Sequence, residues 1–459
     1  MSILNTKILI LGLDCATPDI VFDRANDFPV LRRLQDNGLW GTMRSSDPPI
    51  TIPAWMVMCT GLDAARLGVY GFRHRTDYSY DRMWTATSKS FPDKKLWDYV
   101  GERGGRSVLV SVPPSYPPYP VPGELVSCFI TPGPENPYTY PAELKAELES
   151  RFGPYIFDAE FRTDDRDLIL KKTYEMTDQR FAVLDYLLTR KLWNLFMFVE
   201  IGVDRMHHTF WKYHDRAHHL YEPGNRYEKA IIDYYKHVDA KLGELLAKAG
   251  DDTLVLAISD HGAKRMKGAF CINHWLVDQG LLTMKEIPAK PVTIEKLPVD
   301  WSRTKAWGWG GYYARIFLNV EGREPAGIVP AEDYERFRDE LAAKIMAIRG
   351  PNGEKWETKV IKPQEHWEEL NGDYPDLMVY FDDLFWRSAG TLGHKGLYLA
   401  ENDTGPDDAV HAQEGMYILY DPRRQESKRR DIDILDVAPT VLDRLGLPVP
   451  KEMKGKIIR

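Results

Sequence analysis

The chain has 459 residues, 43% of them hydrophobic, and its 68 acidic and 60 basic residues give a net charge of −8. This acidic balance argues against a protein that coats nucleic acid, although local basic pockets are compatible with it. No run of about 18 apolar residues occurs, so we expect no membrane span. The length predicts roughly two to four domains or one large elaborated domain.

The N-terminus and the cysteines predict a cytoplasmic protein. The first residues show no charged leader, apolar stretch and cleavage site in succession. The four cysteines are far apart and form no Cys-x-x-Cys pair: Cys15, Cys59, Cys128 and Cys271. This spacing excludes a disulfide scaffold and a cysteine-rich zinc module, and it favours a reducing compartment.

Short apolar runs alternate with helical stretches along the N-terminal half. Buried strands are predicted at 7–11, 107–112, 194–201 and 253–259, and helices at 30–37, from 51, at 94–103, 164–188 and 225–248. The proline- and tyrosine-rich segment 112–122 is expected to be an ordered loop, because proline fits neither a regular helix nor a central strand. This alternation is typical of a mainly parallel sheet covered by helices.

After Gly262 the sequence changes character. The segment 263–385 contains several tryptophans, the pair Gly310-Gly311 and a charged helix predicted at 331–348. Core character returns with a predicted strand at 415–420 and a helix at 434–445. We therefore expect a three-layer α/β/α sandwich formed by residues 1–262 and 386–459, with 263–385 as an inserted α+β lobe that sets specificity.

Three aspartates follow three of the predicted strands: Asp14, Asp204 and Asp260. In open α/β sheets, ligands bind outside the carboxyl ends of the strands, so these carboxylates can converge on one site. The alternative for each of them is a turn or a helix N-cap. His208 is four residues after Asp204, a spacing that places both side chains on one helical face, and His261 directly follows Asp260.

A third histidine is expected late in the chain. His411 is the favoured candidate, and His394, in a glycine-flanked segment, competes with it. Any single histidine could equally belong to the surface or the core. Aspartate and histidine together, without cysteine, predict Zn²⁺ or Mn²⁺ rather than Ca²⁺.

Thr51 is the candidate nucleophile. It stands just before Pro53 at the start of a predicted helix, and helix N-termini stabilise anions such as phosphate. A nearby metal would lower the pKa of the threonine hydroxyl. The alternative is that Thr51 only caps the helix.

With these residues the chain resembles the alkaline phosphatase superfamily, in particular the type I phosphodiesterase/nucleotide pyrophosphatase branch. The matching segments follow that family's order: Leu11-Gly-Leu-Asp14, Ile50-Thr51-Ile-Pro53, Cys59-Thr60-Gly61, Asp204-x-x-x-His208, Ser259-Asp260-His261-Gly262, His411, Asp433-Ile-Leu-Asp436 and Leu445-Gly-Leu-Pro448. Each segment alone is weak, whereas the ordered set is specific.

The resemblance implies a phosphoester hydrolase with two divalent metals about 4 Å apart. One metal would be held by Asp14, Thr51, Asp260 and His261, and the other by Asp204, His208 and His411, with His394 as an alternative ligand. Thr51 would attack phosphorus in line and form a phospho-threonine that is then hydrolysed. Zn²⁺ is the expected metal, with Mn²⁺ as the alternative.

The phosphate-binding segment departs from the family pattern, because Phe72 stands where nucleotide pyrophosphatases carry an asparagine. Basic residues that could contact phosphate instead are Arg73, His74, Lys264, Arg265 and Lys267. The alternative for these residues is a solvated surface. The Thr51 segment also lacks the nearby arginine of alkaline phosphatases, and Trp55 offers an apolar wall that suits the second ester group of a diester.

Several functions stay open besides a phosphodiesterase: a phosphomonoesterase, a transferase of phosphoryl or head groups, and a non-catalytic protein that binds a phosphorylated ligand. A sulfatase is disfavoured because Thr51-Ile-Pro53-Ala-Trp55 lacks the cysteine or serine and the arginine of that class. A cofactor-independent phosphoglycerate mutase is disfavoured because it would carry a serine nucleophile and a larger insertion. The expected partner is a small-molecule phosphoester, and the oligomeric state is left open.

Overall fold

The computed structural model describes residues 5–459, so Met1 to Leu4 at the start of the N-terminal stretch lie outside the described residues. Within that range the central sheet has ten strands in the order β22-β2-β21-β9-β1-β8-β5-β6-β7, with β23 beside β2. The parallel strands are β9 (Leu254–Ile258), β1 (Ile8–Leu13), β8 (Leu195–Glu200), β5 (Ser107–Val110) and β6 (Gly123–Val126). The remaining strands are β2 (Leu39–Arg44), β7 (Thr139–Tyr140), β21 (Glu414–Tyr420), β22 (Lys428–Arg429) and β23 (Ile432–Asp433), of which β21 runs antiparallel to β9.

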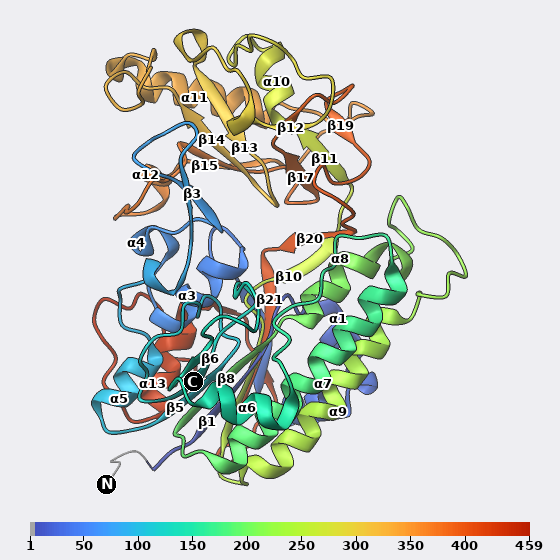
Figure 1. Cartoon of the computed structure of the whole chain (residues 1–459), viewed down its shortest axis with the longest axis vertical. Helices are drawn as coiled ribbons and strands as arrows, with labels where there is room; N and C mark the ends of the chain where they lie inside the picture. The colour runs from blue at the N-terminus through green and yellow to red at the C-terminus, as the bar shows by residue number, and fades with distance from the viewer. Residues whose placement is uncertain (1–4) are drawn as a thin grey trace.

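Helices cover both faces of this sheet (Figure 1). One face carries α1 (Pro18–Asp23), α2 (Pro29–Asp36), α6 (Leu144–Phe152), α7 (Arg166–Arg190), α8 (Gly202–His214) and α9 (Ala230–Ala249). The other face carries α3 (Thr51–Thr60), α4 (Ala64–Leu67), α5 (Leu96–Glu102) and α13 (Val437–Arg444). The expected three-layer α/β/α sandwich with a mainly parallel sheet is confirmed.

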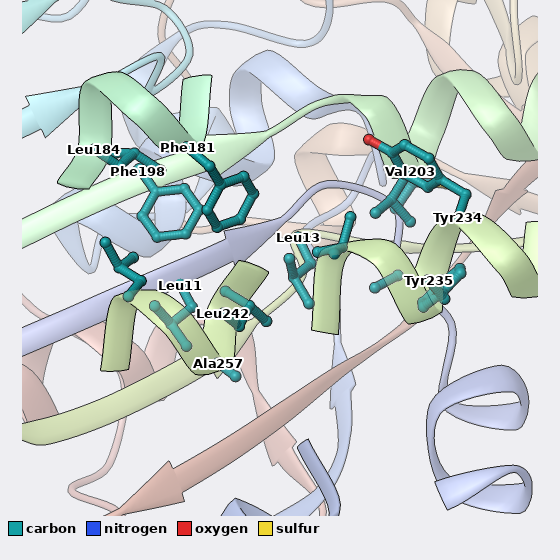
Figure 2. Packing of buried hydrophobic residues seen from close by; sticks show 14 of the residues in the cluster. Leu11, Leu13, Phe181, Leu184, Phe198, Val203, Tyr234, Tyr235, Leu242 and Ala257 are labelled. Carbon is teal, nitrogen blue, oxygen red and sulfur yellow. The ribbon is translucent and has the colours of Figure 1, made fainter. Parts of the chain in front are cut away.

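The central strand β1 shows why the apolar runs are continuous. Leu11 and Leu13 pack with residues of α7, α8 and α9, whereas Ile8 and Ile10 pack with α3 and α13 on the opposite face. Side chains alternate across a strand, so a strand covered on both faces needs apolar residues at every position. Figure 2 shows the first of these two cores, in which Leu11 lies near Leu242.

A second lobe lies beyond the end of the sheet where the parallel strands finish (Figure 1). Its antiparallel sheet has the order β13 (Ala306–Trp309), β14 (Ala314–Leu318), β16 (Leu377–Tyr380) and β15 (Lys359–Ile361). The helices α10 (Ile272–Asp278), α11 (Tyr334–Met346) and α12 (Pro363–His366) belong to the same segment. Trp307 and Trp309 are buried in the apolar core of this lobe, so these tryptophans stabilise the lobe itself.

The expected boundary of the lobe at residue 385 stays a prediction. Strand β11 (Gly268–Cys271) pairs with β17 (Trp386–Ala389) and β19 (Tyr398–Leu399), so a boundary at 385 would divide this sheet. Strand β10 (Gly262–Arg265) pairs with β20 (Ala409–Ala412) where the chain passes between core and lobe. Among the helices of residues 5–459, none combines the length and the apolar character that crossing a membrane requires.

Candidate metal centre and active site

The three aspartates come from neighbouring strands of the central sheet. Strand β1 lies between β9 and β8 and is parallel to both. Asp14 directly follows β1, Asp260 follows β9 after one residue, and Asp204 lies in the first turn of α8, which follows β8. The carboxyl ends of three adjacent parallel strands therefore bring together carboxylates that are distant in the sequence.

Each of these carboxylates has one oxygen held by a donor and one oxygen without a hydrogen bond. The donors are Trp55 Nε1 to Asp14 Oδ2 (2.8 Å), Arg205 Nη1 to Asp204 Oδ2 (2.6 Å) and the Cys15 amide to Asp260 Oδ1 (3.2 Å). The second oxygens, Asp14 Oδ1, Asp204 Oδ1 and Asp260 Oδ2, are buried and accept no hydrogen bond from residues 5–459. Buried carboxylate oxygens without a partner are costly, so this arrangement fits bound cations.

Three histidines present the same nitrogen to these oxygens. The outer Nδ1 atoms lie near acceptors: Asp407 Oδ1 for His208 (2.7 Å), Pro49 O for His411 (2.7 Å) and Gly262 O for His261 (3.2 Å). Because carbonyl and carboxylate oxygens only accept, each Nδ1 donates. Burial lowers the pKa of His261 and of His411, so the Nε2 lone pairs of these two neutral rings face the site. At His208 the effect of burial is outweighed by Tyr312, Asp407 and Asp204, which raise the pKa of this ring well above its usual value. Such outer hydrogen bonds fix the tautomer and orientation of metal-ligating histidines.

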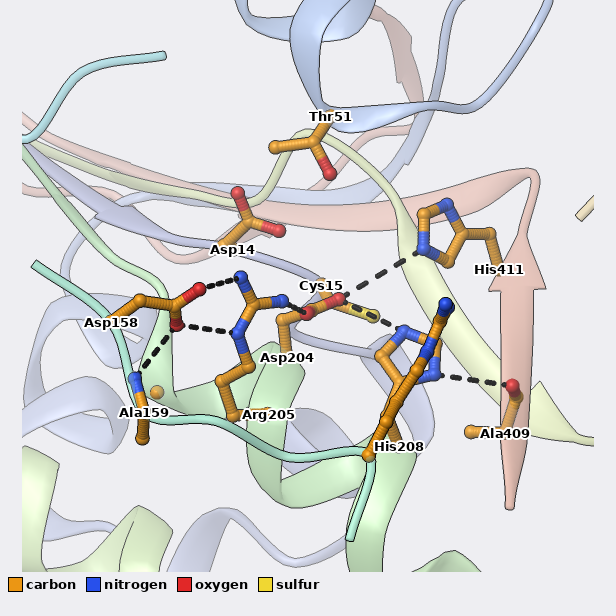
Figure 3. A network of polar contacts seen from close by, with 12 residues as sticks. Asp14, Cys15, Thr51, Asp158, Ala159, Asp204, Arg205, His208, Ala409 and His411 are labelled. Atoms are coloured by element: carbon orange, nitrogen blue, oxygen red, sulfur yellow. Dashed lines mark hydrogen bonds and ion pairs between the residues drawn. The ribbon is translucent and has the colours of Figure 1, made fainter. Parts of the chain in front are cut away.

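The potential ligand atoms form three overlapping groups, one of which contains Cys15, Asp204 and His208. Figure 3 shows the side chains of Asp14, Thr51, Asp204, His208 and His411 at the site. The atoms of Asp14, Asp260 and His261 lie within 4.8 Å of one another, as do those of Asp204, His261 and His411. His208 joins the second group, since its Nε2 is 3.1 Å from Asp204 Oδ1. Oxygen and imidazole donors at such distances suit divalent transition metals.

The electrostatics of the site show a shortage of positive charge. Burial raises the pKa of Asp14 and of Asp260, and the neighbouring carboxylates raise both further. Burial also acts on Asp204, but His208 and Arg205 outweigh it and hold its pKa well below the usual range. Burial lowers the pKa of His261 to about 4, so this ring is neutral near pH 7 and its Nε2 is free to bind a cation.

Thr51 lies at the edge of this centre. It is the first residue of α3, it is 5% exposed, and its Oγ1 is 3.3 Å from His261 Nε2. The amides in the first turn of a helix have no partners within the helix, so they are available to an anion. The predicted nucleophile Thr51, the six other predicted ligand residues and a helix N-terminus are thus brought together by the fold.

A cleft of about 610 Å³ lies over the site, between core and lobe. Thr51, Asp204 and His411 line it on the side of the metal centre. Its apolar wall contains Phe72, Phe129 and Phe161. The lobe contributes Tyr312, whose ring stacks on His411 at a centroid distance of 3.8 Å.

Of the predicted substrate contacts, Phe72 and Arg73 line the cleft. Trp55 instead is fully buried and binds Asp14, because α3 turns this side chain toward the sheet. His74 is buried as well, stacked on Trp84, with Nε2 2.8 Å from the Tyr70 amide.

The other basic candidates are held by carboxylates away from the lining of the cleft. Lys264 pairs with Asp383 at 2.8 Å and Arg265 with Asp215 at 3.4 Å, and Lys267 likewise pairs with an aspartate. The alternative ligand His394 bonds Thr391 at 2.7 Å in the lobe, apart from these groups of ligand atoms.

Sequence reasoning missed the residues that hold the ligands in place. Arg205 fixes Asp204 and is itself held by both oxygens of Asp158, at 2.7 and 2.8 Å. Asp407 fixes His208, and only its position shortly before His411 hinted at a role. Cys15 adopts a positive φ of 66° beside the site, a conformation that only the folded backbone reveals.

Comparison with solved structures shows the same fold. A murine ectonucleotide pyrophosphatase/phosphodiesterase 5, an inactive threonine-to-alanine variant in complex with AMP, is 14% identical with a TM-score of 0.58, over 97% of this chain and 96% of that chain. The human ectonucleotide pyrophosphatase/phosphodiesterase 5 is 13% identical with a TM-score of 0.56, over the same shares. No curated protein sequence matches the chain at a significant level.

The family model of the type I phosphodiesterase / nucleotide pyrophosphatase matches residues 8–407, a range that includes Thr51 and all the predicted ligands except His411. This match covers most of the chain and agrees with the order of motifs described above. The chain therefore belongs to the type I phosphodiesterase / nucleotide pyrophosphatase family, whose members are metal-dependent hydrolases of phosphoester bonds.

Proposed function

We propose that the cleft is the active site of a two-metal phosphodiesterase with Thr51 as its nucleophile. The observation that carries this proposal is the convergence of unpartnered carboxylate oxygens and histidine Nε2 atoms beside Thr51 Oγ1. A helix cap alone would explain the position of Thr51 but not the buried oxygens that face it.

We assign the ligand residues to two cations. Asp14, Asp260, His261 and Thr51 would hold one, and Asp204, His208 and His411 would hold the other. We propose Zn²⁺, with Mn²⁺ as the alternative, because the donors are carboxylates and imidazoles. When bound, such metals lower the pKa of a hydroxyl and neutralise the charge that develops on phosphate oxygens.

The residues of the chain position the reacting groups. Thr51 Oγ1 forms the bond to phosphorus, and the alcohol of the scissile ester departs from the opposite side. The first turn of α3 directs amides toward the phosphate oxygens. Water then breaks the bond between Oγ1 and phosphorus and restores the threonine, so the net reaction is hydrolysis.

The cleft favours a diester over a monoester. A monoester carries about two negative charges and calls for an additional cation that faces the metals. Arg205 lines the cleft near Asp204, but Asp158 and Asp204 already balance its charge. Arg162 and Arg387 are balanced by Asp407 in the same way, and Arg73 and Arg315 lie outside the strand ends that carry the three aspartates. Phe72, Phe129 and Phe161 take the place of Trp55 as the apolar wall against which a second ester group can pack.

We expect kcat/KM for bis(p-nitrophenyl) phosphate to exceed that for p-nitrophenyl phosphate by at least about tenfold, which corresponds to about 1.4 kcal/mol. A p-nitrophenyl ester of a nucleoside 5′-phosphate is a useful third substrate, since the murine relative was crystallised with AMP. A monoester preference above tenfold would contradict the diester assignment. In that case Arg73→Ala should reverse the ranking, because Arg73 is the exposed cation of the cleft.

We also propose that the protein works in a reducing compartment such as the cytoplasm. All four cysteines are buried and unpaired, which supports this location. Cys15 lies beside Asp14 at the candidate metal centre, where burial raises the pKa of its thiol well above the usual value.

A further inference from the structure

Five arginines line the cleft: Arg73, Arg162, Arg205, Arg315 and Arg387. They differ in whether a nearby carboxylate balances their charge. Three of them donate to Asp158, Asp204 or Asp407. Within residues 5–459, neither Arg73 nor Arg315 has a carboxylate oxygen within 4.0 Å. These two arginines therefore give the cleft positive charge that no carboxylate contacts directly, although Glu295 and Asp373 act on Arg315 from a distance.

Arg315 is held in place by neutral groups. It extends from β14 of the lobe, with its guanidinium 4.9 Å from the ring centroid of Trp309. Its Nη1 donates to the carbonyl oxygen of Arg73. Burial lowers the pKa of Arg315, which means that its environment disfavours the charge. A partly buried cation without a counter-ion costs stability, and such violations concentrate at functional sites.

Arg73 comes from the other side of the junction. It begins β3 (Arg73–Arg75), which pairs with β4 (Met83–Thr85) in a hairpin of the core, and its side chain is exposed. Because the Arg73 carbonyl binds Arg315, the two residues lie side by side across the boundary between core and lobe. Both arginines line the same cleft as Thr51.

We propose that Arg73 and Arg315 bind a second anionic group of the substrate, a phosphate dianion, while the scissile diester lies at Thr51. Guanidinium groups recognise phosphate through paired, charge-assisted hydrogen bonds, and two guanidiniums that line one cleft match a dianion better than a monoanion. The substrate class is thus a phosphodiester whose organic group ends in its own phosphate. This inference rests on the proposed diesterase function and narrows its substrate.

A series of synthetic diesters tests the subsite. Each is a p-nitrophenyl alkyl phosphate whose alkyl chain of varied length ends in methyl, carboxylate or phosphonate. We expect kcat/KM for the best phosphonate to exceed that for the methyl ester of equal length by at least about tenfold, with the carboxylate between them. A ratio below about two at every chain length would overturn the proposal.

Variants locate the effect on the two arginines. In Arg315→Met the ratio of phosphonate to methyl ester should fall to near one, and in Arg315→Lys it should be intermediate. Arg73→Met is the second test. The Arg73 side chain is exposed, so this variant is expected to fold like wild type. The matched control is Arg303→Met, which removes an exposed arginine of the same lobe outside the cleft and should keep the wild-type ratio. An unchanged ratio in both Arg315→Met and Arg73→Met would refute the assignment.

Binding separates failure of the subsite from failure of the proposed function. Calorimetry with the phosphonate and methyl diesters on the Thr51→Ala protein measures affinity without turnover. If wild type cleaves no diester but Arg315→Met still weakens phosphonate binding at least about tenfold, the anion subsite stands and the diesterase proposal fails. If diesters are cleaved but the phosphonate binds no better than the methyl ester, only the subsite fails.

Discussion

Replacing Thr51 with alanine is expected to lower kcat for a p-nitrophenyl diester by about a thousandfold or more, because the attacking oxygen is removed. Among residues 5–459, the Thr51 side chain hydrogen-bonds only to His261, and the N-cap of α3 uses no side-chain hydrogen bond. Folding and metal content should therefore be largely retained. Steady-state kinetics together with metal analysis and thermal unfolding measure all three properties.

The matched control is Thr60→Ala, the same substitution at the opposite end of α3. Thr60 is buried and its Oγ1 donates to the Met56 carbonyl at 2.7 Å, away from the metal centre. It should cost about 1 kcal/mol of unfolding free energy and leave kcat within a few fold. Turnover of Thr51→Ala within about tenfold of wild type would remove Thr51 from the mechanism.

The second large effect concerns the late histidine. His411→Ala is expected to release one of the two proposed metals and to lower kcat/KM at least about a hundredfold, because a ligand is lost. His411 Nε2 is 3.9 Å from Asp204 Oδ1, and its ring stacks on His261 at 3.7 Å. His394→Ala should keep both metals, since His394 bonds Thr391 in the lobe.

The two histidine variants serve as controls for each other. Metal content per chain, measured after gel filtration, and diester turnover are compared under the same conditions. If His411→Ala kept both metals while His394→Ala lost one, the assignment would be reversed.

Most of the core and the convergence of the three aspartates could be predicted because local patterns determine them. The strand at 7–11 corresponds to β1, and the helix at 164–188 corresponds to α7. An aspartate after each of three parallel strands predicts convergence, and the sheet places these strands next to one another as β9, β1 and β8. The i, i+4 spacing of Asp204 and His208 lies within α8, as the helical interpretation requires.

Contacts between distant segments could not be predicted in the same way. His208 hydrogen-bonds Asp407, which is 199 positions away in the sequence, and Tyr312 of the lobe contacts the same histidine. The orientation of Trp55 depends on how α3 packs on the sheet, which hydropathy does not reveal. Similarly, the pairing of β11 with β17 joins residues on both sides of the expected lobe boundary, and no local pattern marks it.

The charge balance of the cleft could not be predicted from the sequence either. Its arginines are separated along the chain, and which of them meet an aspartate follows only from tertiary contacts. Arg205 is balanced by Asp158, 47 positions earlier, whereas Arg315 contacts the Arg73 carbonyl and the Trp309 ring. On this difference rests the proposal that Arg205 orients a metal ligand whereas Arg315 is available to a substrate.

The most direct test of a two-metal active site is a titration of the chelator-stripped protein with Zn²⁺, and in parallel with Mn²⁺, while diester turnover and bound metal per chain are measured. The proposal predicts negligible turnover without metal, a rise that is complete only at two bound ions per chain, and loss of the second ion in His411→Ala. Full activity in the stripped protein, or at a single bound ion, would contradict it.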